Sequence, residues 1–375
     1  METDRGGFAI ETHGLTKRFR QADAVNGLSL RVPAGSVYAF LGRNGAGKTT
    51  TIRMLLDLLD RTSGEAKVLG LDCRRDALEI KRRVGYVAEG CRMYDWMTVD
   101  EIIWFCKGFY PGWDDALAAE LKQRLDLDGN KRIRELSRGT QARLLLLLAM
   151  AYHPELLILD EPTAGLDVIV RRSFLEGVIE LLSEEGRTVF FSSHLVHEVE
   201  RVADWVGIIH EGSLVFSGPI EELKSQVKLL YLTYEQPPAS FAAIPGVLSV
   251  DTNARQAAVT VRGFSDATVD AAHQIGASAV SVTDLSLEDL FVALVGREEG
   301  WDGHIRSGKG RLEALEGGAR GAAGAGRRAH GRSHRGSVAA AQFSSCAVRR
   351  VHSGIRVGVY GACHRRRHRR HQRPA

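Results

Sequence analysis

Runs of apolar residues alternate with amphipathic segments along most of the chain. Short apolar runs at 36–41, 156–159, 188–191 and 206–209 predict buried strands. Longer segments at 50–59 and 170–184 have helical spacing, and further strands are predicted at 8–11 and 28–32. Strands that alternate with helices predict an α/β fold with a parallel sheet covered by helices.

The pattern divides the chain into parts of different character. Residues 1–225 form a first domain, and within it 91–150 is predicted to be a helical subdomain. Residues 226–296 alternate as strands at 230–234, 257–261 and 279–282, with helices at 267–275 and 287–295, which predicts a small α+β domain. Residues 297–375 show no sustained periodicity and are rich in Gly, Ala, Arg and His, so this tail is predicted to be disordered.

Charge separates the tail from the rest. The 375 residues have a net charge of +4, but residues 297–375 hold 18 basic and 5 acidic side chains, which leaves 1–296 at −9. We therefore expect no nucleic acid to bind the folded part. The tail resembles the product of a GC-rich gene translated out of frame, and a genuine basic arm that binds anionic surfaces is the alternative.

No apolar run is long enough to span a bilayer, no signal peptide is evident, and the five cysteines lack metal-ligand spacing, so a reduced, cytoplasmic protein is expected.

A glycine-rich segment lies between the strand at 36–41 and the helix at 50–59. Its sequence fits G-x-x-x-x-G-K-[ST], which is typical of a phosphate-binding loop in this context. The glycines allow successive backbone N–H groups to face phosphate oxygens, and the helix start adds its positive dipole end. Lys48 would bind the β- and γ-phosphates, and the Thr49 hydroxyl would bind Mg²⁺. The predicted nucleotide-binding residues are Gly42, Arg43, Asn44, Gly45, Ala46, Gly47, Lys48, Thr49 and Thr50.

A second motif ends the apolar strand 156–159 with two acids, Asp160 and Glu161. A buried strand that ends in carboxylates requires partners for them. Mg²⁺ suits Asp160, and Glu161 could polarise a water for attack on the γ-phosphate. Taken alone, solvated acids at a strand end would explain this motif equally well.

A third motif, Leu-Ser-Arg-Gly-Thr-Gln at 136–141, begins 23 residues before Asp160 with Ser137. By itself it predicts a helix N-cap. Together with the other two motifs, in this order, it resembles the signature sequence of ABC-type ATPases. The resemblance covers about residues 8–225 and implies a P-loop ATPase fold.

Further residues gain roles through this resemblance. It implies that Phe19 stacks on adenine, that Glu89 and Asp160 join Thr49 at Mg²⁺, and that His194 contacts the γ-phosphate as a catalytic switch beside Glu161 and Lys48. It also implies a head-to-tail pair of ATPase subunits, in which Ser137, Gly139 and Asp167 face the partner's ATP. Each alone has a simpler explanation: a structural histidine, a core or surface aromatic, a solvated acid.

Two motifs depart from the family pattern. Glu89 stands where Gln is usual, which adds a negative charge near the phosphates. The signature reads Leu-Ser-Arg-Gly-Thr at 136–140 where Leu-Ser-Gly-Gly-Gln is usual; Ser137 and Gly139 remain, and Arg138 adds a positive charge near the partner's nucleotide. Neither departure affects Lys48, Asp160 or Glu161, so ATP hydrolysis remains the prediction.

One ATPase domain without a membrane span resembles the separate ATPase subunit of a transporter, bound through an integral membrane permease to the inner face of the cell membrane. The ending at 285–291 resembles the branch that exports drugs, antibiotics or lipids. The segment 93–99 would receive the permease through an exposed cluster of aromatic and methionine side chains, with ordinary helix packing as the alternative. A soluble ABC-type ATPase that acts on ribosomes or nucleic acid, and an ATP-sensing module, are the other candidate functions.

Overall fold

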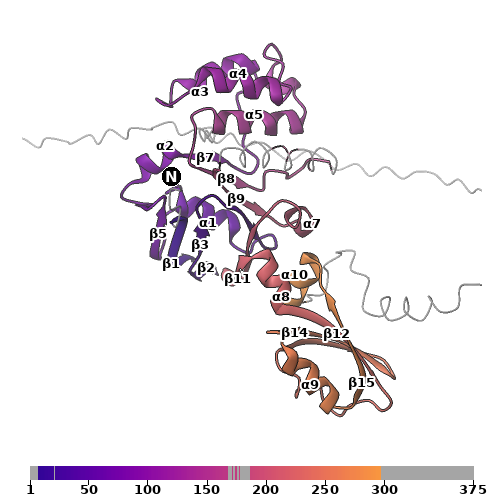
Figure 1. Ribbon diagram of the computed structural model, residues 1–375. Coiled ribbons are helices and arrows are strands. Elements are labelled where there is room, and N and C mark those ends of the chain that lie inside the picture. Colours follow the sequence, from indigo (N-terminus) through magenta and orange to yellow (C-terminus); the bar gives the residue numbers. More distant parts are fainter. Residues whose placement is uncertain are drawn as a thin grey trace, which may run out of the picture. The chain divides into compact units, whose positions relative to one another are not determined.

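The computed structural model describes residues 7–20, 22–167, 171, 174, 177 and 186–296 (Figure 1). The predicted tail at 297–375 lies outside the described residues, as does most of the helix predicted at 170–184. In the part of the chain that the structure describes, no helix is both long and apolar enough to cross a bilayer.

The central sheet has six strands in the order β11-β10-β4-β9-β8-β7. All are parallel except β11, which pairs with β10 in the antiparallel sense. The bounds are β4 (Val37–Leu41), β7 (Val84–Val87), β8 (Leu156–Asp160), β9 (Thr188–Ser193), β10 (Trp205–His210) and β11 (Ser213–Pro219). Every residue of β4, β8 and β9 is buried, which explains their unbroken apolar runs and confirms the predicted parallel sheet.

A second, antiparallel sheet has the order β2-β1-β5-β6, with β3 also paired to β1. Its strands are β1 (Phe8–Phe19), β2 (Ala22–Leu28), β3 (Arg31–Pro33), β5 (Ser63–Val68) and β6 (Leu71–Asp72). The single strand predicted at 28–32 is wrong, because the chain leaves β2 at Leu28 and enters β3 at Arg31. The buried Thr12 hydroxyl bridges this break: it donates to the Leu28 carbonyl at 2.9 Å and accepts from the Leu30 N–H at 2.8 Å.

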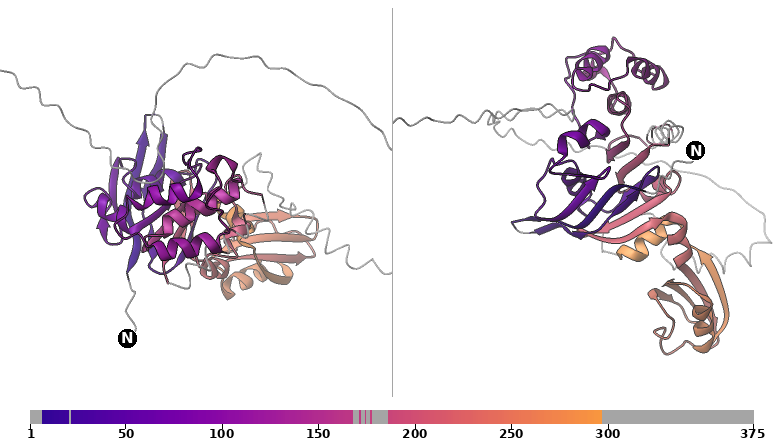
Figure 2. Two further views of the ribbon diagram at one scale, coloured as in Figure 1. Left: turned by 90° about the horizontal axis from the view of Figure 1, so that it is seen from above. Right: turned by 60° about the vertical axis from the view of Figure 1, so that its left-hand side comes forward.

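The α-helices that the structure describes between residues 22 and 167 are α1 (Lys48–Leu55), α2 (Ala77–Arg83), α3 (Val99–Lys107), α4 (Asp115–Arg124) and α5 (Arg138–Met150). The last three confirm the predicted helical region, and α3 and α4 both pack on α5 (Figure 2). A capping box of Thr98 and Glu101 starts α3, and Asp114 caps α4. The helix predicted at 50–59 is shorter at its end than expected, since Asp57 adopts a left-handed φ of 50°.

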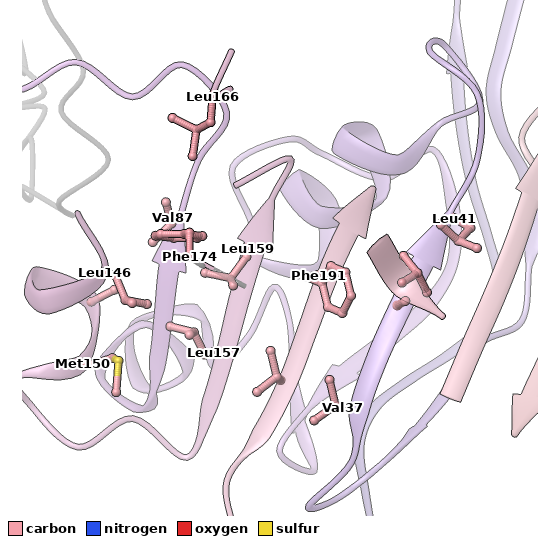
Figure 3. Close-up of a cluster of buried hydrophobic side chains, with 14 of the residues drawn as sticks. Val37, Leu41, Val87, Leu146, Met150, Leu157, Leu159, Leu166, Phe174 and Phe191 are labelled. Carbon is pink, nitrogen blue, oxygen red and sulfur yellow. The ribbon is translucent and has the colours of Figure 1, made fainter. Parts of the chain in front are cut away.

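One buried cluster joins the helices to one face of the central sheet (Figure 3). Leu157, Leu159 and Phe191 project from β8 and β9 toward this cluster, and Leu146 and Met150 enter it from α5. Leu166, from the loop after β8, and Phe174, which lies near Val87 and Leu159, also belong to this cluster. The residues that follow β8 are therefore anchored by buried apolar side chains.

The C-terminal part has a four-stranded antiparallel sheet in the order β13-β14-β12-β15. Its strands are β12 (Val227–Tyr234), β13 (Val247–Thr252), β14 (Gln256–Arg262) and β15 (Ala277–Asp284), and its helices are α9 (Asp266–Gln274) and α10 (Leu287–Val295). The predicted strands and helices are present; β13 was not predicted, because most of its residues are exposed and it has no apolar run. Helix α10 packs against α7 (Val196–Val199) and α8 (Ile220–Gln226).

Candidate nucleotide site

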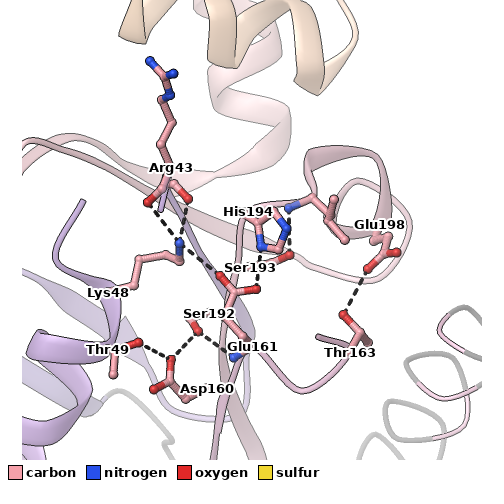
Figure 4. A network of polar contacts seen from close by, with 12 residues as sticks. Arg43, Lys48, Thr49, Asp160, Glu161, Thr163, Ser192, Ser193, His194 and Glu198 are labelled. Carbon is pink, nitrogen blue, oxygen red and sulfur yellow. Dashed lines mark hydrogen bonds and ion pairs between the residues drawn. The ribbon is translucent and has the colours of Figure 1, made fainter. Parts of the chain in front are cut away.

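The predicted catalytic residues meet at the carboxyl ends of β4, β8 and β9 (Figure 4). Strand β9 lies between β4 and β8, so the loop after β4, the acids after β8 and the residues after β9 all reach one edge of the sheet. Crevices at this edge are where open α/β sheets bind ligands. The structure therefore brings together three segments that are far apart in the sequence: the loop after β4, the acids 160–161 and the residues at the end of β9.

The loop 42–47 can be built only with glycine at some positions. A Cβ at Gly47, where φ is 109°, would lie 2.5 Å from the Ala24 carbonyl oxygen, and one at Gly42 would lie 2.7 Å from the Ile209 carbonyl oxygen. Helix α1 begins directly after this loop, with no acidic residue in its first turn and no capping side chain among the described residues. Its positive end is therefore free to face an anion.

Lys48 is buried at 5% exposure and makes close contacts with three oxygen atoms. Its Nζ donates to the carbonyl oxygens of Gly42 at 2.7 Å and Arg43 at 3.2 Å, and it lies 3.0 Å from Oε1 of Glu161 (Figure 4). A buried ammonium group needs such compensation. Lys48 is thereby held between the phosphate-binding loop and the acid proposed to activate water.

Asp160 is the last residue of β8, and its side chain is almost fully buried. The hydroxyl groups of Thr49 and Ser192 donate to Oδ1 at 3.0 and 2.8 Å. Burial raises the pKa of the Asp160 carboxyl; these two hydrogen bonds lower it in part, and the negative charge of Glu89 raises it again.

The second carboxylate oxygen of Asp160, Oδ2, is buried without a hydrogen-bond donor in the described part of the chain. A Mg²⁺ ion would supply the partner that such an oxygen lacks, and the neighbouring Thr49 hydroxyl would be a suitable second ligand. No group of three His, Cys, Asp or Glu side chains that could hold a metal occurs in the described segments. The residues therefore fit an ion bound mainly through the nucleotide phosphates and water.

Glu161 follows β8 in a left-handed conformation, with φ at 46°. Its N–H donates to Oγ of Ser192 at 2.9 Å, and Nδ1 of His194 donates to its Oε2 at 2.8 Å. Burial by itself would raise the pKa of Glu161, but the hydrogen bond from His194 and the positive charge of Lys48 outweigh it, so that the pKa lies below its ordinary value. Glu161 is thus ionised, as a general base must be.

Ser192 was not among the predicted site residues, although it connects both acids. It is fully buried and contacts Asp160 through its hydroxyl hydrogen and the Glu161 N–H through its oxygen. Its signal in the sequence is a polar residue at the end of an otherwise apolar strand.

Glu89 and Phe19 both have exposed side chains. Strand β7 ends at Val87, and Glu89 follows in the turn, where its charge acts on Asp160. Phe19 ends β1 with 48% of its surface exposed, and Nζ of Lys17 lies 5.1 Å from the centre of its ring. An exposed aromatic ring is available for stacking on a base.

Ser137 and Gly139 start a different helix. The Ser137 hydroxyl caps α5 by accepting from the Thr140 N–H at 3.1 Å, and Gly139 is buried in the first turn. Within the segments described, no hydrogen bond links either residue to the network around Lys48. Asp167 is exposed in the loop after Glu161. This separation within one chain is what a head-to-tail pair of subunits requires.

The segment predicted to receive a permease differs in part from expectation. Met93 and Met97 are buried in the core at 5% and 8% exposure, so the expected exposed methionines are wrong. The large apolar side chains that are exposed here are aromatic: Trp96 at 63% and, beyond this segment, Trp104, which was not predicted, at 75%. The methionines face inward because Val99 and Ile102 of the adjoining helix anchor this segment in the same cluster.

Comparison with known proteins connects this geometry to a family. A family model described as ABC transporter matches residues 25–164. The bacitracin transport ATP-binding protein BcrA of Bacillus licheniformis is 33% identical over 304 residues, covering 76% of this chain and 97% of the relative. The daunorubicin/doxorubicin resistance ATP-binding protein DrrA of Streptomyces peucetius is 35% identical over 226 residues, covering 58% of this chain and 68% of the relative.

Solved structures share the fold. One titled as the ATP binding subunit of an ABC transporter has a TM-score of 0.53 at 23% identity and covers 58% of this chain and 92% of its own. A dimeric post-hydrolysis state of the ATP-binding cassette MJ0796, bound to ADP and Pi, has a TM-score of 0.51 at 20% identity and covers 56% of this chain and 98% of its own. The predicted α/β P-loop ATPase fold is confirmed.

Proposed function

This chain belongs to the family of ABC transporter ATP-binding proteins and is an ATPase; on that premise we propose that it powers a separate membrane permease that exports a drug, an antibiotic or a lipid. The observation that best supports the proposal is the match to a bacitracin transport protein over 97% of that relative's length, which includes the C-terminal part. The chain would lie on the cytoplasmic side of the membrane, bound to its permease.

Lys48 would change partners when ATP binds. The γ-phosphate carries more negative charge than a carboxylate and approaches over the loop 42–47, so it would draw Nζ away from Glu161. The start of α1 adds backbone N–H groups and its dipole to the same phosphates. Binding of ATP would thereby free the Glu161 carboxylate at the moment when a base is needed.

Glu161 would then orient the attacking water and accept its proton. Nδ1 of His194 holds the carboxylate from the other side at 2.8 Å, which restricts its rotation, and His194 would contact the γ-phosphate. Phe19 would stack on the adenine. The negative charge that develops on the phosphates would be balanced by Lys48 and His194.

Mg²⁺ would supply charge neutralisation and a fixed geometry for the phosphates. Thr49 and Asp160 would hold it, with Glu89 on the open side. Ser192 fixes the Asp160 carboxylate through Oδ1 and leaves Oδ2 for the ion.

Two such subunits would face each other head to tail. Ser137, Gly139 and Asp167 of one subunit would then complete the ATP site of the other, which explains why they stand apart from Lys48 within a chain. The relative MJ0796 is dimeric in its solved structure. Closure on ATP and reopening after hydrolysis would move the permease.

An exposed aromatic cluster on the helical subdomain would contact the permease. Trp96 packs on Tyr94 with ring centres 5.9 Å apart, and Phe105 connects Tyr94 to Phe109 at 5.7 and 5.1 Å. Trp104, which belongs to α3 like Phe105, has 75% of its surface exposed. Exposed aromatic groups are typical of interface centres.

Paired variants test this function. Trp104→Ala should abolish co-purification with the permease encoded nearby and its stimulation of ATP hydrolysis, while the rate of the isolated chain stays unchanged. Leu78→Ala, which removes another exposed apolar group (65% exposed) from α2, is the matched control. Normal permease binding by Trp104→Ala would contradict the proposed surface.

The alternative partner, ribosome or nucleic acid, is supported only by the basic residues 297–375. It predicts association with RNA that weakens steeply as salt rises. If the full chain binds RNA in this way and no membrane protein, the transport proposal is wrong.

A further inference from the structure

The loop 163–167, which follows the catalytic acid, is tied to one arginine. Nη2 of Arg171 donates to the Leu166 carbonyl oxygen at 2.9 Å, and the Arg171 N–H donates to the Asp167 carbonyl oxygen at 2.9 Å. With Leu166 buried in the core cluster, these bonds hold the loop by its backbone. The exposed Asp167 side chain therefore projects from a loop whose backbone is fixed by Arg171 and Leu166.

The same arginine is paired with an acid from another part of the chain. Nη1 of Arg171 lies 3.2 Å from Oε1 of Glu198, and the two side chains are only 18% and 9% exposed. The buried Thr163 hydroxyl donates to the other carboxylate oxygen of Glu198 at 3.4 Å (Figure 4). Glu198 therefore connects with both ends of the loop.

Glu198 belongs to α7, which begins two residues after His194. Val196 and Val199 bury one side of this short helix in the core cluster, so α7 cannot rotate independently of its surroundings. A shift of the backbone at His194 would therefore displace α7, and Glu198 with it. The ion pair of Arg171 and Glu198 therefore connects two parts of the chain. One is His194, which would contact the ATP of its own subunit, and the other is the loop 163–167, which would face the ATP of the partner.

The opposite side of the loop rests on the signature segment. A Cβ built at Gly165 would lie 2.7 Å from Nη1 of Arg138, so the guanidinium group of Arg138 lies directly against the Gly165 backbone. The loop is therefore held between Arg138, near the nucleotide of the partner, and Glu198, behind His194 of its own site.

We propose that Arg171 and Glu198 are positioning residues that couple the two ATP sites of the dimer. They transmit the position of His194 in one subunit to Asp167, which faces the ATP of the other. The inference rests on the head-to-tail dimer of the proposed function. Neither residue touches the nucleotide, so their loss should alter the association of the two subunits and not the affinity of one subunit for ATP.

Dimer formation can be measured in a Glu161→Gln background, where ATP is bound but hydrolysed slowly. Arg171→Ala removes both the ion pair and the Leu166 contact, and Glu198→Gln removes only the charge and keeps the volume. Glu200→Gln is the matched control, because it breaks an ion pair at the end of the same helix, to Lys224 at 3.2 Å, without reaching the loop. Association is followed by analytical ultracentrifugation with ATP, and ATP affinity by calorimetry.

We expect Arg171→Ala and Glu198→Gln to weaken the ATP-dependent dimer by about tenfold or more, within the usual range for coupling between sites. ATP affinity of the single subunit and the Glu200→Gln dimer should change less than about twofold. If both variants dimerise with ATP as strongly as their parent, the inference is overturned. It is also overturned if ATP affinity and thermal stability fall together with dimerisation, because that indicates a structural role alone. If the Glu161→Gln parent itself remains monomeric with ATP, the dimer of the proposed function is wrong and the inference with it.

Discussion

The ion pair between Lys48 and Glu161 predicts that Glu161→Gln lowers the free energy of unfolding of the protein without nucleotide. Both side chains are buried, at 5% and 7% exposure, and their charged atoms lie 3.0 Å apart. Breaking a buried pair by removing one partner commonly costs ~3–5 kcal/mol. Here Lys48 keeps its bonds to two carbonyl oxygens, and the amide oxygen of Gln can accept a hydrogen bond, so we expect a loss of about 1–3 kcal/mol in the free energy of unfolding.

The same change should strengthen ATP binding. Removal of the carboxylate removes the competitor for Lys48 and a negative charge next to the phosphates. At saturating ATP, each tenfold gain in affinity adds ~1.4 kcal/mol of stability. The variant should therefore unfold at lower temperature than the wild type without ATP, and ATP should raise its melting temperature by more.

Hydrolysis should fall by about 10²–10⁴-fold, the usual contribution of a general base. The assays are phosphate release and thermal unfolding with and without ATP. Glu79→Gln, which breaks an exposed pair with Arg82, is the control and should leave both unchanged. Hydrolysis within tenfold of the wild type, or weaker ATP binding, would refute the reasoning.

The pH dependence of stability follows from the lowered pKa of Glu161. An acid whose pKa is lowered by folding stabilises the protein at pH values above its ordinary value of 4.5, and this contribution is lost as the pH falls through the lowered pKa. The stability difference between wild type and Glu161→Gln should therefore be constant near neutral pH and disappear in acid. A difference that persists in acid would contradict the assigned ion pair.

Three further changes test other parts of the structure. Asp160→Asn removes a buried carboxylate whose pKa is raised by burial. It should therefore raise the free energy of unfolding at neutral pH by about 0.5–2 kcal/mol, while ATP hydrolysis is lost. Lower stability in thermal unfolding would contradict this. Gly165→Ala places a side chain at φ +75° and against Arg138, and should lower stability by about 1–2 kcal/mol in denaturant titrations, whereas Gly108→Ala, at an open helix end, should not. Truncation after Gly296 should leave the ATPase rate unchanged in a phosphate-release assay, and a loss of activity would give the basic tail a role in hydrolysis.

The sequence alone determined the local elements and the chemistry that each contributes. The loop 42–49 is recognisable because glycine, lysine and threonine are needed at fixed spacing between a strand and a helix. Asp160 and Glu161 are recognisable because two acids end an apolar strand. These signals are short-range, and the structure reproduces the strand, loop and helix that they predict.

The tertiary structure decided which residues meet. The position of β9 between β4 and β8 places Ser192 against both acids and His194 against Glu161, and no pattern within one segment specifies that order. The left-handed turn at Glu161 and its pairing with Lys48 depend on contacts across 113 positions of the chain. Packing likewise decided that Met97 faces the core and Trp104 the solvent, because the same apolar side chain suits either environment until its neighbours are in place.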